Sequence, residues 1–402
     1  MTKNDDKRVP ALRFKGFNDD WAQRKLGDVT QRVQGNNNDM NLPILTISAK
    51  NGWMTQVKRF SNIIAGAEKK KYTLLKKGEL SYNHGNSKLA PFGTVFMLDS
   101  YSEALVPKVY HSFKTGKDIE PYFVELYFHT KKVDFQLRKY ISSSARMDGL
   151  LNITYNWFKQ IKIFVPKMNE QNKLKKIFLI LNKYISLQQR KAQQLKLLKK
   201  AMLQDIFPNT QGIRQIKLSN NIWVEKRMVD IFKEKNIRSK NGELLSVSIS
   251  KGIYPFSNSE RKNNSSTNKS NYKKVTPGDI AYNSMRMWQG ALGVSKYNGI
   301  VSPAYTVMAT KEKENPLFYY YYFKNTRMMF NFRQHSQGLT SDTWNLKFPL
   351  LKKIAIQIPI NKNEEEKIIK LFESIDIAIT SIELKIEKLK AVKQFLLQNM
   401  FI

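Results

Sequence analysis

The sequence predicts an α+β protein made of two similar mixed α/β domains, each followed by a long helix, with the two helices packed as an antiparallel coiled coil. Three observations lead to this prediction: an internal repeat, short β-rich segments between turn signals, and two long heptad segments. We expect a first domain over residues 1–168, a first helix over 169–207, a second domain over 208–361 and a second helix over 362–402.

The repeat keeps its order along the whole chain. "GELSYN" at 78–83 returns as "GDIAYN" at 278–283, and "LTISAKNG" at 45–52 returns as "LSVSISKG" at 245–252. Only the start is weakly echoed, since "ALRFKGFNDDW" at 11–21 corresponds to "GIRQIKLSNNIW" at 212–223. The period of about 200 residues is far longer than that of a solenoid repeat, so we interpret the chain as a duplicated domain.

Each copy begins with β-rich segments such as "LPILTIS", "GTVFML" and "IAIQIP", separated by turn signals such as "KNG" and "TPG". Two further segments, 121–140 and 315–335, begin at or beside a proline and have helical apolar spacing. Since proline suits the first turn of a helix, we expect one helix in each of them.

The two tails have apolar residues at alternating intervals of three and four, which is the pattern of a coiled-coil seam. Lys199 and Lys393 interrupt the two seams at equivalent places, and Glu170 and Glu364 stand in the first turns, where carboxylates suit the helix dipole. Neither helix can bury its apolar stripe alone, so we expect them to pack on each other. The seam and partner-docking residues that we single out are Phe178, Leu181, Ile185, Leu195, Phe372, Ile375, Ile379 and Leu389.

The charge is unusual for a globular composition. Sixty-eight Lys and Arg against 33 Asp and Glu give a net charge of +35. Such an excess repels itself in a compact chain unless a polyanion offsets it, and nucleic acid is the commonest such partner. A low-GC genome rich in Lys and Asn codons is the alternative explanation.

The chain has no cysteine, which excludes disulfides and Cys-ligated zinc and suits a reducing compartment. Its start carries no apolar stretch, and its longest apolar runs are far shorter than the ~20 residues of a membrane span. We therefore expect a cytoplasmic protein with no membrane segment.

Two similar domains joined by paired helices in a basic chain suggest a protein that binds DNA at two sites separated by a fixed distance. Helices of about 38 residues rise about 57 Å, which covers at most about 17 base pairs. Because the domains are alike in scaffold and unlike in loops, we expect two half-sites that differ in sequence.

At this point the order of segments resembles a known family. The succession "ALRFKGF…W…KLGDV", "KKGELSYNHG", "SSSARMDGLLNI…IKIFVP" and a long helix, followed by the whole again, is similar to the specificity subunit of type I restriction-modification systems over essentially the full chain. The resemblance implies two target-recognition domains that read the halves of a split double-stranded DNA target. It also implies docking of two methyltransferase subunits, which bind S-adenosylmethionine, and of restriction (translocase-nuclease) subunits. By the same resemblance, this chain has neither a cofactor nor catalysis of its own.

The residues carry no strong enzyme motif. There is no Asn/Asp-Pro-Pro-Tyr/Phe motif, no strand–GxGxxG–helix and no GxxxxGK[ST]. Asp376, Glu383 and Lys385 have the D…ExK spacing of many nucleases, but they lie in a predicted heptad helix, and we interpret the spacing as chance. The four histidines are scattered without ligand spacing. A fused restriction-modification enzyme and an RNA-binding structural protein remain the alternatives.

Most of the predicted DNA contacts lie in loops where the two copies diverge, above all directly after "ELSYN" and "DIAYN", and Arg146 and Arg333 are further basic candidates near helix ends. Arg reads guanine and Asn or Gln reads adenine in the major groove, while Lys mostly neutralises phosphate. Equivalent loops with different polar residues are what two different half-sites require. The candidates are Lys50, Lys58, His84, Asn86, Lys88 and Arg146 in the first copy and Lys251, Arg261, Arg286, Gln289 and Arg333 in the second.

Overall fold

The computed structural model describes residues 8–62, 66–141, 151–208, 212–259, 262–263, 265–311 and 314–402. The chain forms two compact units, of which the first combines two separate pieces of sequence and the second is continuous. Unit 1 comprises residues 1–188 and 385–402, and unit 2 comprises residues 189–384. Each unit is described by itself below.

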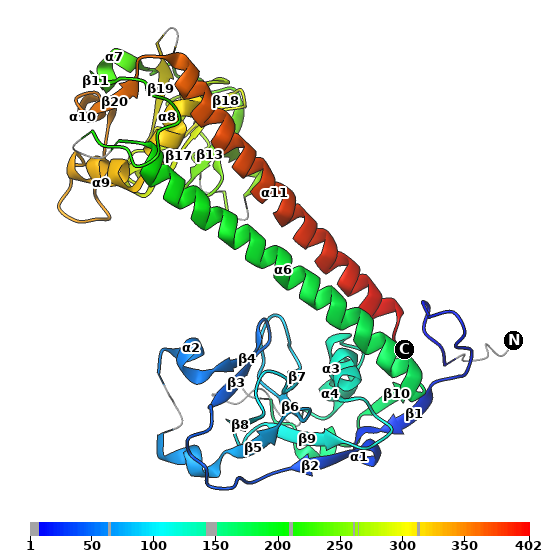
Figure 1. Ribbon diagram of the computed structural model, residues 1–402. Coiled ribbons are helices and arrows are strands. Elements are labelled where there is room, and N and C mark those ends of the chain that lie inside the picture. Colours follow the sequence, from blue (N-terminus) through cyan, green and yellow to red (C-terminus); the bar gives the residue numbers. More distant parts are fainter. Residues whose placement is uncertain are drawn as a thin grey trace, which may run out of the picture. The chain divides into compact units, whose positions relative to one another are not determined.

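The same antiparallel sheet recurs in both units, which confirms the duplicated fold (Figure 1). In unit 1 its strand order is β2-β9-β6-β7, and in unit 2 it is β12-β19-β16-β17. The strands of unit 1 are β2 (Thr30–Val33), β6 (Leu80–Asn83), β7 (Thr94–Met97) and β9 (His111–Thr115). Those of unit 2 are β12 (Phe232–Glu234), β16 (Ile280–Asn283), β17 (Leu292–Val294) and β19 (Tyr305–Thr310).

The repeated phrase forms one turn and one strand in each unit. Gly78 and Gly278 both have φ of +87°, a conformation that glycine adopts without steric cost, and they precede β6 and β16. Both strands are central in their sheets, and their first three residues are buried. This burial explains why the phrase survives in both copies as scaffold.

The remaining strands also correspond. A two-stranded sheet closes each unit, β1 (Ala22–Lys25) with β10 (Lys162–Val165) and β11 (Trp223–Arg227) with β20 (Ala355–Pro359). Unit 1 has two further antiparallel pairs, β3 (Leu45–Ser48) with β4 (Gly52–Thr55) and β5 (Thr73–Lys76) with β8 (Glu103–Val106). Unit 2 joins its equivalents into one sheet, in the order β14 (Gly252–Pro255), β13 (Glu243–Ser248), β18 (Gly299–Val301) and β15 (Lys273–Val275).

Short helices link the strands. Those of unit 1 are α1 (Leu26–Val29), α2 (Gln56–Phe60), η1 (Gly66–Lys71), α3 (Pro121–His129), α4 (Asp134–Lys139) and α5 (Tyr155–Phe158). Those of unit 2 are α7 (Met228–Ile231), η2 (Phe256–Asn258), η3 (Met287–Gln289), α8 (Pro316–Phe323), α9 (Thr326–Gln334) and α10 (Phe348–Leu351).

The expectation of one helix in each of the segments 121–140 and 315–335 is wrong, because each segment forms two helices. In unit 1, Lys131 has φ of +65°, which ends α3 before α4 can begin. In unit 2, the Asn325 side chain accepts a hydrogen bond from the backbone N–H of Arg327 at 2.8 Å and so caps α9. The expected starts are confirmed, since Pro121 and Pro316 each occupy the first turn of a helix.

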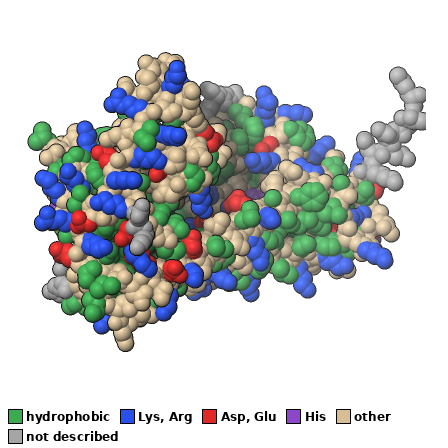
Figure 2. All heavy atoms as spheres, turned by 90° about the horizontal axis from the view of Figure 1, so that it is seen from above, with side chains coloured by type: hydrophobic (Ala, Val, Ile, Leu, Met, Phe, Trp, Pro, Cys, Tyr) green, Lys and Arg blue, Asp and Glu red, His purple; other side chains and the backbone are tan. Residues whose placement is uncertain are grey.

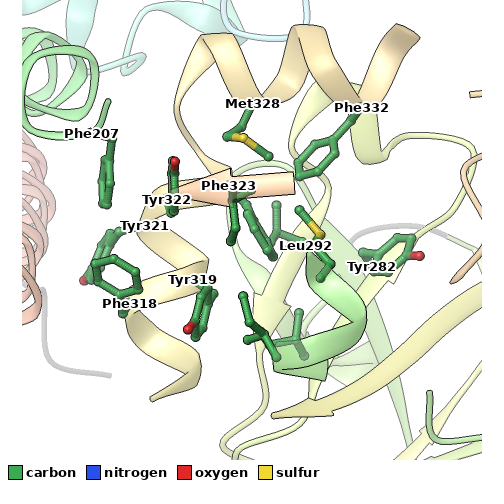
Figure 3. Packing of buried hydrophobic residues seen from close by; sticks show 14 of the residues in the cluster. Phe207, Tyr282, Leu292, Phe318, Tyr319, Tyr321, Tyr322, Phe323, Met328 and Phe332 are labelled. Atoms are coloured by element: carbon green, nitrogen blue, oxygen red, sulfur yellow. The ribbon is translucent and has the colours of Figure 1, made fainter. Parts of the chain in front are cut away.

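Aromatic side chains dominate the core of unit 2. Figure 3 shows the side chains of α8, among them Tyr322 and Phe323, packed with Phe332 of α9. The rings of Phe207 and Tyr322 stack at 4.6 Å with an interplanar angle of 7°. The core of unit 1 is built around Trp21, whose ring lies 5.9 Å from that of Phe123. Burial of rings of this size is a large part of what stabilises each unit.

The two long helices are α6 (Met168–Ile206) and α11 (Lys362–Asn399). In unit 2, Lys196 pairs with Glu383 and Lys199 with Asp376, so the sequence runs in opposite directions along the two helices. In unit 1, Phe178 near the start of α6 packs with Phe401, just beyond the end of α11, at 6.1 Å between rings. Each unit thus contains an antiparallel pair of helical segments, as the heptads predict.

The burial of the seam is consistent with the predicted heptad register, since every predicted seam residue is buried or half-buried. Phe178 and Phe372 are fully buried, and Ile185, Ile375 and Ile379 are nearly so. Leu181, Leu195 and Leu389 are half-buried. The apolar stripes therefore face protein.

An arginine near the start of each copy binds the first turn of a long helix. Arg13 donates to both carboxylate oxygens of Glu170, at 2.8 and 2.9 Å, and Arg214 pairs with Glu364. Both glutamates are buried, so each depends on its arginine for charge compensation. The starting segments of both copies therefore supply an arginine that pairs with the first-turn glutamate of a long helix, although their sequences agree only weakly.

Candidate nucleic-acid interface

The loop that follows β6 in unit 1 contains both exposed and buried candidates. Asn86 and Lys88 are exposed, as a DNA contact requires. His84 is buried, and its two ring nitrogens each lie 2.7 Å from a backbone carbonyl oxygen, Nδ1 from that of Leu151 and Nε2 from that of Val109. The proposed DNA contact by His84 is therefore corrected, because its ring ties three loops together and presents no free edge.

A stack of rings surrounds His84. Its ring lies 5.2 Å from that of His111 with an interplanar angle of 10°. His111 in turn contacts Tyr155, over which the guanidinium of Arg32 lies at 4.4 Å. Burial lowers the pKa of His111 to about 4, so this imidazole is neutral near pH 7. The rings of His84, His111 and Tyr155 therefore pack against one another at the end of β6.

In unit 2 the corresponding loop carries the candidates Arg286 and Gln289. Arg286 comes just before η3, which contains Gln289, and its Nη2 lies 3.8 Å from Oδ1 of the exposed Asp342. An ion pair of this length between exposed groups is weak, so Arg286 can exchange Asp342 for another acceptor at little cost. Both Arg286 and Gln289 are half-buried as residues, and the Arg286 side chain is 41% exposed.

Two tryptophans connect this loop to the third candidate of unit 2. Trp288 of η3 meets Trp344 edge to face at 5.2 Å, and the exposed Arg333 lies over the Trp344 ring at 4.7 Å. The structure therefore brings Arg333 close to the loop of Arg286 and Gln289. Sequence reasoning did not anticipate that aromatic rings would hold these cationic side chains.

A polar cavity of about 860 Å³ in unit 2, which we call the polar groove, was missed by the sequence predictions. The carboxylate of Glu234 lines it, together with three amides and three cations that suit reading adenine edges and neutralising phosphates. The amides and cations are Asn236, Asn271, Asn345, Arg238, Lys273 and Lys347. Each adjoins the end of a strand or a short helix, but they are scattered over 110 residues, and no local sequence signal joins them.

The polar groove contains an amide oxygen without a hydrogen-bond partner and a half-buried lysine close to two other cations. Among the described atoms, Oδ1 of Asn345 is buried without a hydrogen-bond partner. Burial lowers the pKa of Lys273, the carboxylate of Glu234 in the same groove raises it, and the neighbouring Lys347 and Arg238 lower it. A bound anion would relieve this repulsion, while an unpaired amide oxygen offers an acceptor for a base amino group.

The other predicted contacts lie on exposed turns or outside the described residues. Lys50, Lys58 and Lys251 are exposed, and Nζ of Lys251 lies over the Tyr254 ring at 5.3 Å. Arg146 and Arg261 lie outside the described residues. Figure 2 shows Lys and Arg side chains spread over the visible face with fewer Asp and Glu among them, as the net charge of +35 requires.

The groups that resembled a nuclease site serve the helix pair instead. In unit 2, Oδ1 of Asp376 lies 2.5 Å from Nζ of Lys199 and Oε1 of Glu383 lies 2.5 Å from Nζ of Lys196. Across the part of the chain that the structure describes, there is no group of three residues able to hold a metal ion. Within the same part, none of the helices has the length and apolarity needed to cross a membrane.

The sequence model described as "Type I restriction modification DNA specificity domain" matches residues 18–197 and again residues 220–391. The chain belongs to this family. The two matches coincide with the two copies found from the repeat, so the family membership applies to both halves of the molecule. The chain is therefore a DNA sequence-specificity subunit of the type I restriction-modification class.

Solved structures support the fold. The type I restriction-modification S subunit from M. genitalium is 13% identical, with a TM-score of 0.59 over 98% of this chain and 99% of that one. A second solved structure is described as "Structural basis underlying complex assembly and conformational transition of the type I R-M system". Its matching chain is also 13% identical, with a TM-score of 0.54, and the match covers 95% of this chain and 97% of that one. No curated protein sequence matches this chain significantly.

Proposed function

We propose that this chain reads a split, asymmetric DNA target, with one half read by each recognition domain. The observation that supports this best is the contrast between equivalent positions of the two units. Their central sheets have the same strand order, but the side chains that follow β6 and β16 differ in size, charge and hydrogen-bonding type. Two copies that read the same half-site would have no physical reason to diverge at these positions in particular.

In the proposal, each half-site is read by its own set of loops. Asn86, Lys88, Lys50 and Lys58 serve the first half, while Arg286, Gln289, Arg333 and Lys251 serve the second. The polar groove adds amides to the second set, which suits a half-site that contains adenine. The division of the chain at residues 168, 207 and 361 into recognition domains and helices belongs to the same proposal.

The long helices fix the spacer between the half-sites and dock partner subunits in this proposal. Apolar side chains outside the seam support docking, since large exposed apolar groups on a helix favour contact with another protein. In unit 1 these are Leu179, Ile180, Leu187, Val392 and Phe395, and in unit 2 they are Leu197, Leu198, Ile377 and Leu384. The expected partners are two methyltransferase subunits, which bind S-adenosylmethionine, and the restriction subunits that join them.

The chain has no catalysis of its own in this proposal. Purified chain incubated with DNA, S-adenosylmethionine and Mg²⁺ should neither methylate nor cleave the DNA, whereas adding a methyltransferase subunit should produce methylation. Modification or cleavage by the chain alone would instead identify a fused restriction-modification enzyme.

The target form can be tested by selection. Duplexes with a random central segment are bound by the full chain together with its methyltransferase and sequenced. We expect two short, unlike motifs separated by an unspecified spacer of constant length. One continuous motif, a palindrome, or preferred binding to RNA hairpins would contradict the proposal.

A further inference from the structure

A second cavity, of about 340 Å³, lies in unit 1, and we call it the lysine cavity. Its walls come from the β3–β4 turn, the loop after β6, the turn between α3 and α4, and the last turns of α11. Four lysines and one carboxylate line it: Lys50, Lys131, Lys390, Lys393 and Asp134. Cations from three segments far apart in sequence therefore converge on one small space.

Lys393 is half-buried, whereas the other three lysines of the cavity are exposed. Among the described residues, its Nζ makes no recorded hydrogen bond or ion pair, and Glu125 is the charged group that acts on it. Burial raises the pKa of Glu125 to about 8, so near pH 7 this carboxyl is mostly neutral and supplies little negative charge. Lys393 thus keeps a half-buried charge without a counterion, a costly arrangement that a bound anion would relieve.

The equivalent position in unit 2 shows what a compensated lysine looks like. Lys199 occupies the same heptad place in α6, and its Nζ lies 2.5 and 2.7 Å from the two oxygens of Asp376. Tyr321 donates to the same carboxylate at 3.0 Å. The duplication placed a lysine in both seams, but in unit 2 it pairs with Asp376, whereas in unit 1 the nearby carboxyl of Glu125 is mostly protonated near pH 7.

A polar atom in the wall of the lysine cavity also lacks a partner. Within the described part of the chain, Nε2 of His129 is buried and makes no hydrogen bond. Burial and the charge of Lys393 lower the pKa of His129 to about 4, so the ring is neutral and adds no further repulsion to the lysines. Because the other ring nitrogen donates to the backbone of Val95, Nε2 of the neutral ring carries a lone pair, so an anion in the cavity would be bound by the lysines and not by His129.

We propose that the lysine cavity holds a phosphate group of the DNA backbone, so that α11 contributes directly to DNA binding in unit 1. This proposal rests on the DNA-reading function argued above and extends it from the loops to a helix. A DNA phosphate is favoured over free phosphate because the cavity is continuous with predicted DNA contacts. Lys50 lines it, and so do Leu89 and Gly93 of the loop that carries Asn86 and Lys88.

The test uses the full chain and a mixed-sequence duplex, since a phosphate contact does not depend on the bases. Affinity is measured by fluorescence anisotropy between 50 and 200 mM salt for the parent and for Lys393→Gln. Loss of one phosphate contact should reduce the slope of log K against log salt by about 0.9, and affinity at 0.1 M salt should fall about eightfold.

Matched controls separate this site from a general loss of charge. Lys388→Gln removes the same charge from an exposed place on the same helix that does not line the cavity, and it should leave the slope nearly unchanged. Lys393→Arg should keep the slope. Lys131→Gln, which alters the cavity from outside the helix, should reproduce the effect of Lys393→Gln. Thermal unfolding of each variant confirms that it is folded.

Three outcomes would overturn the proposal. Equal slopes for Lys393→Gln and Lys388→Gln, in a parent chain that does bind DNA, would remove this site and leave the DNA-reading function intact. Stabilisation by inorganic phosphate beyond that by chloride at equal ionic strength, with an unchanged DNA slope, would make it a site for free phosphate. A parent chain that fails to bind any duplex would contradict both proposals together.

Discussion

The ends of β6 and β16 occupy equivalent positions in the two units, but they carry side chains of very different size. Tyr82 faces His111 across the sheet of unit 1, and Tyr282 faces Thr306 across that of unit 2. Two residues beyond each tyrosine, unit 1 places His84 and stacks its ring on His111. Unit 2 places Ser284, whose hydroxyl lies 2.8 Å from that of Thr306.

The consequence of this exchange is a difference in shape. Two imidazoles fill the space at the end of β6, while two small hydroxyl residues leave room at the end of β16 for the polar groove. The backbone register is the same in both units, so the side chains alone decide whether the surface is solid or hollow. The two units thus share the backbone of the central sheet, whereas the residues at two equivalent positions differ: His84 and His111 in unit 1, Ser284 and Thr306 in unit 2.

The largest expected effects test the shared frame. Phe178 and Phe372 stand at equivalent seam positions, and both are fully buried. Replacing either by Ala should cost about 3–5 kcal/mol, because a large cavity is left behind. Hydrogen exchange should show that Phe178→Ala loosens unit 1 and that Phe372→Ala loosens unit 2. Equal loosening of both units by either variant would mean that the frame is one cooperative block.

The variant His84→Ser places in unit 1 the residue that unit 2 has at the equivalent position, Ser284. The carbonyl oxygen that accepts from the ring would lose its donor, the space of the imidazole would be left unfilled and a ring stack would be broken, so we expect a loss of about 3 kcal/mol in the free energy of unfolding. The matched variant Ser284→Ala removes one hydroxyl and should cost about 1 kcal/mol. Denaturant unfolding measures both. A smaller loss for His84→Ser than for Ser284→Ala would show that the ring is not structural.

Glu125→Gln should stabilise the protein in a pH-dependent way. Because burial raises the folded-state pKa of Glu125 to about 8, ionising this group costs the folded state stability. The cost is absent below the unfolded pKa, grows as pH rises from about 4.5 to 8 and is constant above. The variant should therefore gain almost nothing at pH 4 and roughly 4 kcal/mol at pH 8. Thermal melts at both pH values measure this gain, and an equal gain at each would contradict the burial of a titrating carboxyl.

The two seam lysines should respond in opposite directions. Lys199→Gln leaves the half-exposed Asp376 without its cation and should cost about 1 kcal/mol. Lys393→Gln removes a charge that has no recorded ion pair and should leave stability unchanged or slightly raised. The comparison requires this difference in sign. If denaturant unfolding shows equal losses, Lys393 has a compensating group within the folded protein.

Much of this frame follows from the sequence because it rests on short-range patterns. The repeat places β6 and β16, and the heptads place α6, α11 and every seam residue, since burial at intervals of three and four leaves its mark on the sequence. The breaks inside the segments 121–140 and 315–335 were missed, because a single residue, Lys131 with positive φ or Asn325 as a cap, outweighs the apolar spacing.

The candidate site was less accessible to sequence reasoning. Arg286 and Gln289 were found from loop divergence and Arg333 as a basic residue near a helix end, but nothing in the sequence showed that Trp288 and Trp344 would link them. His84 was misassigned because a histidine in a variable loop has the same one-letter appearance whether its ring points into solvent or between carbonyl groups. The polar groove and the lysine cavity depend on contacts between distant segments and have no local signal at all.

The central claim is that each recognition domain reads its own half of the target, and one measurement tests it most directly. The methylated sites of a host are sequenced when it carries the partner methyltransferase with either the parent chain or Arg286→Ala. We expect a split target whose second-domain half alone is relaxed, with about 1–3 kcal/mol of discrimination lost at one position. Changes in both halves, or an equal weakening at every site, would contradict the account.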